Sequence, residues 1–436
     1  MWIPLLALAT TLTLGEGVPA AAPRDVDMSS ARLASVDRIV RRGITVGAYP
    51  GAAVIVGRRG FTVWKKGYGR ISWNEHARPV SPDETIYDLA SLTKVVATTT
   101  AAMILYDEGK LQLDAPVQQY LPEFTGAGKE RVTVRQLLSH HAGLPAGLAI
   151  WRTATDPAGG RLQILQAPLK HAPGTTMLYS DLGPIIAGWV IEAVAQQSLD
   201  HFVQERVFTP LGMTNTGYRP GMALRARIAP TEKGTLRGIG MLQGEVHDET
   251  AFRLNGIAGN AGLFGSAGDL AIFAQMLLNG GTYGGVRIVS DTTIRHFITP
   301  VANARALGWE VAAGERGAGE FLSMNAFGHT GFTGTSLWID PDRELFVILL
   351  TNRVHEPRAK RPGIVIADVR HDLADAAALA ITDAPEIKAL AWPRTFRVDL
   401  AQGWTSRRAP SGPRPTTRPA SRSTSRTATP ARRRGG

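Results

Sequence analysis

Hydrophobic residues near the N-terminus recur first at helical spacing and then in two short continuous runs. Apolar positions over residues 31–42 fall on one face of a predicted helix. Two runs rich in β-branched and aromatic residues follow, over residues 50–57 and 61–67, and the segment between them has the length of a tight turn. The pattern therefore predicts a helix followed by an antiparallel hairpin.

The rest of the chain has a long helical stretch and then a return to strands. Helical spacing predicts helices over residues 90–110, 185–197, 270–278 and 373–381. Two apolar runs, 332–340 and 344–351, flank the turn signal Pro-Asp-Arg and predict a second hairpin. We therefore expect an α+β fold, in which an antiparallel β-sheet is flanked by terminal helices and accompanied by a mainly helical subdomain over about residues 95–290.

The N-terminus has the features of an export signal. An apolar stretch too short to span a bilayer is followed by small residues at 18–21. This order predicts a signal peptide over residues 1–22, although no Lys or Arg precedes the apolar stretch. We expect export to the periplasm or the cell exterior, or retention by an N-terminal anchor. No later segment has about 18 continuous apolar residues, so no second membrane span is predicted.

Composition changes at the C-terminus, where residues 405–436 are mainly Arg, Pro, Ser and Thr. Nine arginines and no acid lie between 407 and 436, so nine of the eleven net positive charges belong to this tail and +2 remains for the rest. A nearly neutral globular part does not indicate nucleic-acid binding. The tail is predicted to be disordered and solvated. A tether to anionic wall polymer or lipid, or a frameshifted gene end, are the alternatives.

Several classes of chemistry find no support in the chain. It has no cysteine, which excludes disulfides, thiolate nucleophiles and cysteine-ligated zinc. It has neither a phosphate-binding loop nor a Gly-x-Ser-x-Gly nucleophile elbow. The histidines at His140, His141 and His247 lack zinc-protease spacing. We therefore predict no metal site and no cofactor, and expect these histidines to support loops around a pocket.

Ser91 and Lys94 form the most informative spacing, because they lie three residues apart where the chain enters a helix. Residues three apart project from the same helical face, within hydrogen-bonding range. A serine hydroxyl becomes nucleophilic when a neighbour accepts its proton, and a helix N-terminus favours a developing oxyanion. The pair also fits a helix-capping serine beside an exposed lysine. On this spacing alone, the two interpretations stay open.

Two later segments carry further candidate residues. Tyr179 and Asp181 lie in a predicted loop after a Pro-Gly turn, and loops often carry catalytic side chains. His329, Thr330 and Gly331 are predicted to begin the strand over residues 332–340, where glycine lets the backbone approach a ligand closely. Taken alone, Tyr179 also fits a core tyrosine and His329 a surface histidine.

The three segments together, in this order, resemble the penicillin-binding-protein and serine β-lactamase superfamily. The resemblance covers about residues 30–385, and we predict a hydrolase domain over residues 30–390. Supporting stretches lie at residues 50–54, 88–94, 137–144, 259–264 and 307–309. They are most similar to the class C β-lactamase branch, which also contains D-Ala-D-Ala carboxypeptidases and esterases.

The resemblance implies a role for each candidate residue. Ser91 would be acylated, Lys94 would accept its proton or tune the base, and Tyr179 would protonate the leaving group and help to activate water. Whether Tyr179 or Lys94 is the primary base stays open. The backbone N–H groups of Ser91 and Phe332 would form the oxyanion hole, while Asp181, His329, Thr330 and Gly331 would line the substrate site.

Two departures from the family pattern bear on the substrate. Asp181 replaces the usual Asn, and an ionised carboxylate would keep Lys94 protonated and repel an anionic substrate. His329 replaces the usual Lys, so a neutral imidazole would stand where a fixed positive charge attracts a substrate carboxylate. Both count against an efficient β-lactamase. The hypotheses are a carboxypeptidase acting on peptidoglycan stem peptides, an esterase or amidase acting on small acyl compounds, a β-lactamase, and a non-catalytic receptor or wall-binding module.

Overall fold

The computed structural model describes residues 17–234, 238, 240–301, 305–311, 318–388 and 395–405. The predicted tail from residue 406 and the first sixteen residues of the predicted leader lie outside these ranges. Within the described ranges, no helix is long and apolar enough to cross a bilayer. The end of the predicted leader contacts the domain, since Ala21 N donates to Thr62 O at 3.0 Å and Thr62 N donates to Pro19 O at 2.7 Å. Export and leader removal stay predictions.

A six-stranded antiparallel sheet joins the two ends of the chain. Its strands are, in spatial order, β2 (Phe61–Gly69), β1 (Gly51–Arg58), β11 (Leu345–Thr351), β10 (Ser336–Asp340), β9 (Phe327–Thr330) and β8 (Glu310–Val311). β1 pairs with β11, from Ala52 opposite Thr351 to Arg58 opposite Leu345. The N-terminal hairpin and the C-terminal strands therefore form one sheet.

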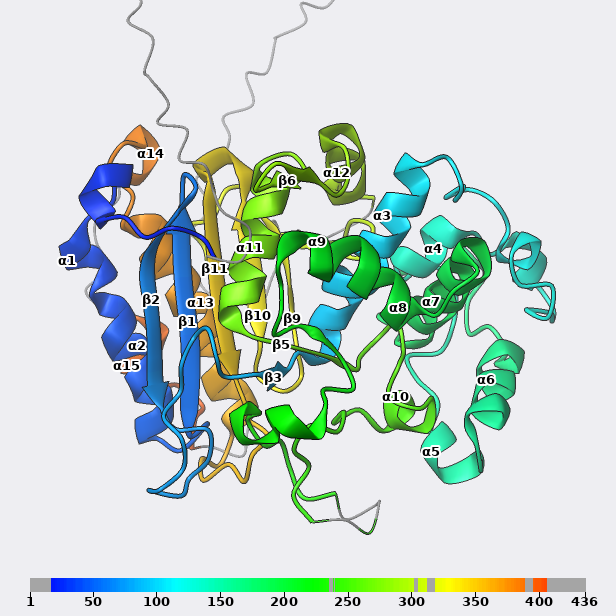
Figure 1. The fold of residues 1–436 in the computed structure, drawn as a ribbon, viewed down its shortest axis with the longest axis horizontal. Helices are drawn as coiled ribbons and strands as arrows, with labels where there is room; N and C mark the ends of the chain where they lie inside the picture. The colour runs from blue at the N-terminus through cyan, green and yellow to red at the C-terminus, as the bar shows by residue number, and fades with distance from the viewer. Residues whose placement is uncertain are drawn as a thin grey trace, which may run out of the picture.

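Helices cover both faces of this sheet (Figure 1). α2 (Ser35–Thr45) and α13 (Pro362–Leu379) pack together on one face, and α11 (Ala267–Leu278) contacts the other. All eight residues of β1 are buried. Because successive side chains of a strand point to opposite faces, Val54 joins the core under the terminal helices and Ile55 joins the core under α11. This explains the continuous apolar run in the sequence.

The remaining helices form a region beside α11 (Figure 1). They are α3 (Thr100–Asp107), α4 (Val134–Leu138), α5 (Ile150–Thr153), α6 (Pro157–Gln166), α7 (Leu182–Ala195), α8 (Leu199–Val203), α9 (Thr209–Leu211), α10 (Glu249–Arg253) and α12 (Asp291–Ile298). β3 (Tyr87–Asp88), β5 (Leu263–Gly265) and β4 (Gly217–Tyr218) form a small sheet in that order, and β6 (Thr282–Tyr283) pairs with β7 (Val286–Arg287). At the termini, α1 (Ser30–Leu33), α14 (Pro385–Lys388) and α15 (Arg397–Leu400) complete the described α-helices. The predicted α+β fold is confirmed.

The helix predicted over residues 90–110 is divided into three parts. A 3₁₀ turn at Ala90–Leu92 and a π-helical turn at Lys94–Thr99 precede α3. Thr100 Oγ1 donates to Val95 O at 2.9 Å and so closes the wider turn. Gly109, at φ +70°, ends the segment, as its conformational freedom predicts. The helix predicted over residues 373–381 begins earlier, at Pro362, and ends at Leu379.

The strand predicted over residues 332–340 is wrong at its start. β9 ends at Thr330 and β10 begins at Ser336, so His329 and Thr330 close one strand of a hairpin rather than opening the next. The Gly331 N–H donates to Thr335 O at 2.7 Å, and Gly334 adopts φ +109°. These two features make a tight turn, which an apolar pattern does not reveal.

A buried histidine links the C-terminal segments to α13. His371 Nδ1 lies 3.2 Å from Asp375 Oδ2 and 3.7 Å from Asp372 Oδ1. Asp372 accepts from the backbone of α15, at Arg397 N and Val398 N. Burial lowers the pKa of His371, but the two carboxylates outweigh it and raise the pKa to about 9.

This cluster predicts a loss of stability at alkaline pH. The folded pKa of His371 is higher than the value of about 6.5 expected for the unfolded chain. Its contribution is therefore fully present below pH 6.5 and is lost as the pH rises through about 9. Between these values we expect the free energy of unfolding, measured by urea titration, to fall more in the wild type than in His371→Gln. Equal pH dependence in the two proteins would contradict this reading of the cluster.

Candidate active site

Ser91 lies in a sharp turn between β3 and the helical segment. Ala90, directly before it, adopts φ +47°, an unusual conformation for a residue with a side chain. Asp88 stabilises the turn, because its Oδ1 accepts from Ala90 N at 2.8 Å and its Oδ2 accepts from His247 N at 2.7 Å. The serine side chain is half-buried. These contacts hold the turn that carries Ser91 in one conformation, as a positioned nucleophile requires.

Lys94 is surrounded by three oxygen acceptors. Its Nζ lies 2.8 Å from Ser91 Oγ, 3.0 Å from the carbonyl oxygen of Asn260 and 2.7 Å from Asp181 Oδ1. Burial lowers the pKa of Lys94, but the Tyr179 and Asp181 oxygens outweigh this and raise the pKa above its usual value. Three acceptors match the three donors of an ammonium group. The predicted approach of Ser91 and Lys94 is confirmed, and Asp181 contacts the lysine as expected.

Tyr179 reaches the same hydroxyl from a distant loop. Its Oη lies 3.2 Å from Ser91 Oγ. The neighbouring residue fixes the loop, since Ser180 Oγ donates to Pro145 O at 2.6 Å and Ser180 N donates to His140 Nδ1 at 3.2 Å. The His140 ring lies 4.6 Å from the Tyr179 ring, between centroids. His140 thus supports a loop of the site, as the sequence predicts.

His329 is buried on β9, where it faces an arginine. Its Nδ1 lies 2.8 Å from the carbonyl oxygen of Thr330, so Nδ1 carries the hydrogen and Nε2 is the acceptor. Arg305 Nη1 lies 3.5 Å from that Nε2. Burial, together with the charges of Arg305 and Lys94, holds the pKa of His329 well below its usual value. The expected neutral imidazole agrees with this environment.

Sequence reasoning missed Arg305 and the carbonyl of Asn260. The Arg305 guanidinium lies 5.1 Å from the centre of the Tyr179 ring and is paired with Glu310 at 2.9 Å. Arg305 therefore places a positive charge near His329, where the family pattern has Lys. Arg305 precedes the 307–309 stretch by two residues, and Asn260 lies in the 259–264 stretch. Those stretches were the only signals for these residues, and neither assigned a role to a side chain or a carbonyl.

The turn after β9 packs against the segment that carries Ser91. Thr333 Oγ1 donates to Asp88 O at 2.8 Å, and Thr335 Oγ1 donates to Leu89 O at 3.0 Å. A Cβ atom on Gly331 would lie 2.6 Å from Leu89 O, which is closer than a real side chain tolerates. Glycine is therefore required at this contact. The turn brings Thr330, Gly331 and Phe332 to the nucleophile segment, while the oxyanion role of the Phe332 N–H stays a prediction.

Phe332 is the most exposed large apolar side chain beside the site, at 63% exposure. Its ring stacks on His247 at 5.7 Å between centroids, and the Arg353 guanidinium lies 4.5 Å from its centre. His247 therefore also supports a segment of the site, as expected. An exposed aromatic ring here is available to contact a bound molecule.

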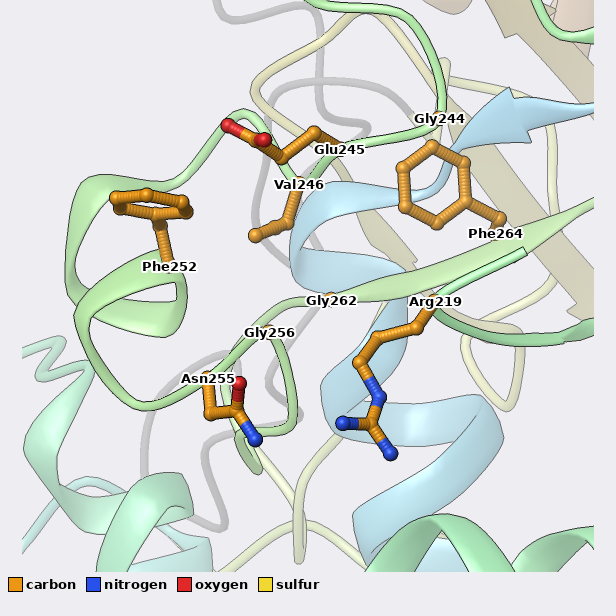
Figure 2. A pocket seen from close by; sticks show the side chains of 9 residues that line it. All are labelled: Arg219, Gly244, Glu245, Val246, Phe252, Asn255, Gly256, Gly262 and Phe264. Atoms are coloured by element: carbon orange, nitrogen blue, oxygen red, sulfur yellow. The ribbon is translucent and has the colours of Figure 1, made fainter. Parts of the chain in front are cut away.

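A cavity of about 200 Å³ lies near this region, beside the loop that follows α10. Figure 2 shows Val246, Phe252 and Phe264 lining it together with the polar side chains of Arg219 and Asn255. None of the predicted site residues, all of which the structure describes, lines this cavity. Within the described ranges, no group of three or more His, Asp or Glu residues is arranged to hold a metal ion.

Comparison with known proteins agrees with this geometry. The model of the family described as Beta-lactamase matches residues 36–371. A candidate D-alanyl-D-alanine carboxypeptidase of Escherichia coli K12 is 32% identical over 397 residues, covering 82% of this chain and 91% of the relative. An N-acetylmuramyl-L-alanine amidase of Bacillus subtilis 168 is 33% identical over 368 residues, covering 76% and 82%.

Solved structures resemble the fold. EstCE1, a hydrolase with promiscuous acyltransferase activity, superposes with a TM-score of 0.63 at 23% identity, covering 78% of this chain and 99% of the other. A penicillin-binding-protein homologue from Caulobacter crescentus gives 0.63 at 21% identity, covering 80% and 98%. These identities establish the fold alone, whereas the family match spans most of the chain. The chain belongs to the β-lactamase family, within the penicillin-binding-protein and serine β-lactamase superfamily of serine hydrolases.

Proposed function

We propose that this chain is an exported serine hydrolase that forms an acyl-enzyme at Ser91 and acts on peptidoglycan stem peptides as a D-Ala-D-Ala carboxypeptidase. The observation that carries the proposal is the convergence of Lys94 Nζ and Tyr179 Oη on Ser91 Oγ, at 2.8 and 3.2 Å. The carboxypeptidase name of the Escherichia coli relative supports the substrate class.

The contacts favour Tyr179 over Lys94 as the group that accepts the serine proton. All three donors of the Lys94 ammonium already have acceptors, so it has no lone pair to offer. Lys94 and Arg305 bring positive charge to within 5.3 and 5.1 Å of the centre of the Tyr179 ring. Proton transfer from Ser91 then requires the phenolate form of Tyr179, whose Oη lies 3.2 Å from Ser91 Oγ.

The proposed reaction has two balanced halves. The Ser91 oxygen attacks the substrate carbonyl while its proton passes to the phenolate oxygen of Tyr179, and the resulting phenol then gives that proton to the leaving amine as the C–N bond breaks. Water, activated through the same phenol oxygen, attacks the acyl-enzyme and releases the acid and the Ser91 hydroxyl. The N–H groups of Ser91 and Phe332 hold the oxyanion in both halves.

The second candidate is an esterase or amidase for small acyl compounds. The Asp181 carboxylate beside Lys94 favours it, because this group repels an anionic substrate. The Arg305–Glu310 ion pair also reduces the charge available to bind a carboxylate.

A side-by-side substrate assay tests the proposal. A muramyl pentapeptide ending in D-Ala-D-Ala, a penicillin and a short-chain nitrophenyl ester are each given to the wild type and to Ser91→Ala. Ser91-dependent release of D-alanine supports the carboxypeptidase, and turnover of the ester alone supports the esterase. Failure of all three, with no penicillin adduct, would favour a non-catalytic receptor.

Asp181→Asn is expected to accelerate acylation by penicillin by about tenfold. The amide keeps a partner for Lys94 but removes a negative charge whose repulsion of a nearby carboxylate is worth roughly 1–2 kcal/mol. The measurement is the rate of covalent penicillin attachment, followed by intact-protein mass. Hydrolysis of a neutral nitrophenyl ester serves as the control and should change less. An unchanged penicillin rate would show that the carboxylate does not restrict this chemistry.

Export and the tail belong to the same proposal. Peptidoglycan lies outside the cytoplasmic membrane, so the substrate class requires a chain that leaves the cytoplasm. We propose that the leader of about 22 residues directs export and that the arginine tail contacts anionic wall polymer or lipid. N-terminal sequencing of the protein recovered from the cell envelope tests the first part. Salt-dependent release from isolated walls, compared with a chain ending at residue 405, tests the second.

A further inference from the structure

A buried arginine on α13 holds both ends of the turn that follows β9. Arg370 is 9% exposed, and its Nη2 donates to Gly331 O at 2.6 Å and to Thr335 O at 2.7 Å. One terminal guanidinium nitrogen carries two hydrogens, so each carbonyl receives one of them. Gly331 N donates to the same Thr335 O. The turn is therefore closed from within by the backbone and from outside by a cation.

The carbonyl of Gly331 belongs to the same peptide group as the Phe332 N–H. A peptide group is planar and almost always trans, so its C=O and N–H point in opposite directions. Fixing the carbonyl toward α13 therefore aims the N–H away from α13. Gly331 lies against Leu89 and Ala90, the two residues that precede Ser91. Arg370 therefore fixes the direction of the Phe332 N–H next to the segment that carries Ser91.

We propose that Arg370 is a positioning residue of the oxyanion hole: it orients and polarises the Gly331–Phe332 peptide so that the Phe332 N–H donates to the oxyanion formed at Ser91. This inference rests on the proposed acylation at Ser91. A charge-assisted hydrogen bond to a carbonyl strengthens the donor at the other end of the same amide. The hydrogen bonds of Arg370 go to backbone carbonyls of the turn, so the proposed role acts through the peptide group and requires no contact with substrate or nucleophile.

The size of the effect follows from the donor that Arg370 supports. Removing one oxyanion donor costs about 10²–10³ in rate. Arg370→Gln leaves the N–H in place but removes its orientation and polarisation. We therefore expect an intermediate loss of about 10–100-fold in kcat for a nitrophenyl ester, with KM changed less than about threefold.

A sulfur-substituted substrate separates this role from a structural one. The assay compares a nitrophenyl ester with its thionoester, in which sulfur replaces the carbonyl oxygen. Sulfur accepts hydrogen bonds weakly, so the ester-to-thionoester rate ratio reports how strongly the oxyanion hole donates. Arg370→Gln should lower this ratio by about the factor by which it lowers the ester rate. Arg370→Lys keeps the positive charge but loses the planar guanidinium group. It should lower the rate ratio by less than Arg370→Gln does, but by more than about threefold.

Arg58 provides a matched control. It is also a buried arginine that donates to backbone carbonyls, those of Val26, Asp27 and Arg343, at 2.7, 2.9 and 3.2 Å, and it pairs with Asp383 at 2.7 Å. Thr351, at one end of β11, contacts the turn, because its Oγ1 donates to Gly334 O. Arg58 lies opposite Leu345, at the other end of β11. Arg58→Gln should lower the melting temperature and leave the rate ratio unchanged.

The outcomes distinguish this inference from the proposed function. A wild type with no Ser91-dependent ester turnover refutes the acyl-enzyme itself, and the inference falls with it. A wild type that turns over the ester, with an unchanged ratio in a folded Arg370→Gln or Arg370→Lys variant, overturns only the role of Arg370. If Arg370→Gln and Arg58→Gln lower the rate ratio by the same factor, the effect reflects lost stability. This result would also overturn the role of Arg370.

Discussion

Ser91→Ala is expected to reduce turnover of every accepted substrate by about 10⁴-fold or more, toward the rate without protein. Lys94 and Tyr179 both contact this hydroxyl, and alanine offers no nucleophile in its place. Initial rates with the best substrate of the assay measure the loss. The fold should persist, because a half-buried serine is exchanged for a smaller residue in an otherwise intact turn.

A serine far from the site controls for this exchange. Ser198 lies at the start of α8 and donates to Asp200 at 2.6 Å on the surface. Ser198→Ala should keep wild-type turnover. A Ser91→Ala protein that retains turnover within tenfold of the wild type would rule out Ser91 as the nucleophile.

Tyr179→Phe is expected to lower kcat by about 10²–10⁴-fold while KM changes little. The substitution removes the oxygen proposed to carry the proton and keeps the ring that packs at 4.6 Å from His140. Steady-state kinetics with the same substrate separate the two constants. A large rise in KM with unchanged kcat would instead indicate a binding role for Tyr179.

Tyr49 offers the matched exchange. Its Oη donates to Val40 O at 2.9 Å in the core under the terminal helices, so Tyr49→Phe loses a comparable hydrogen bond without touching the site. Its kcat should stay at the wild-type value. If Tyr179→Phe behaves like Tyr49→Phe, the proton acceptor is another group, and Lys94 becomes the first candidate.

Local spacing was enough to predict much of the fold and one part of the site. The hairpins and terminal helices follow from patterns of two and 3.6 residues, and the Ser91–Lys94 contact follows from one helical turn. The strand start at residue 332 was wrong because two closely spaced glycines turn the chain within an apolar run. A pattern of polarity carries no signal for such a turn.

Contacts between distant segments could not be derived from spacing. Tyr179 lies 88 residues from Ser91, and its placement came from the family resemblance alone. Arg305, Asn260 and Arg370 were missed because an arginine or a carbonyl has no local signature that distinguishes a site from the surface. Their roles depend on which segments the sheet and α13 bring together.

The most direct test of the central claim is the position of the covalent acyl group. The wild type is mixed with penicillin and with a nitrophenyl ester, quenched in acid during turnover, and analysed by intact mass and peptide mapping. We expect one acyl group, on the peptide that contains Ser91, and none in Ser91→Ala. An acyl group on another residue, or turnover without any adduct in the wild type, would contradict it.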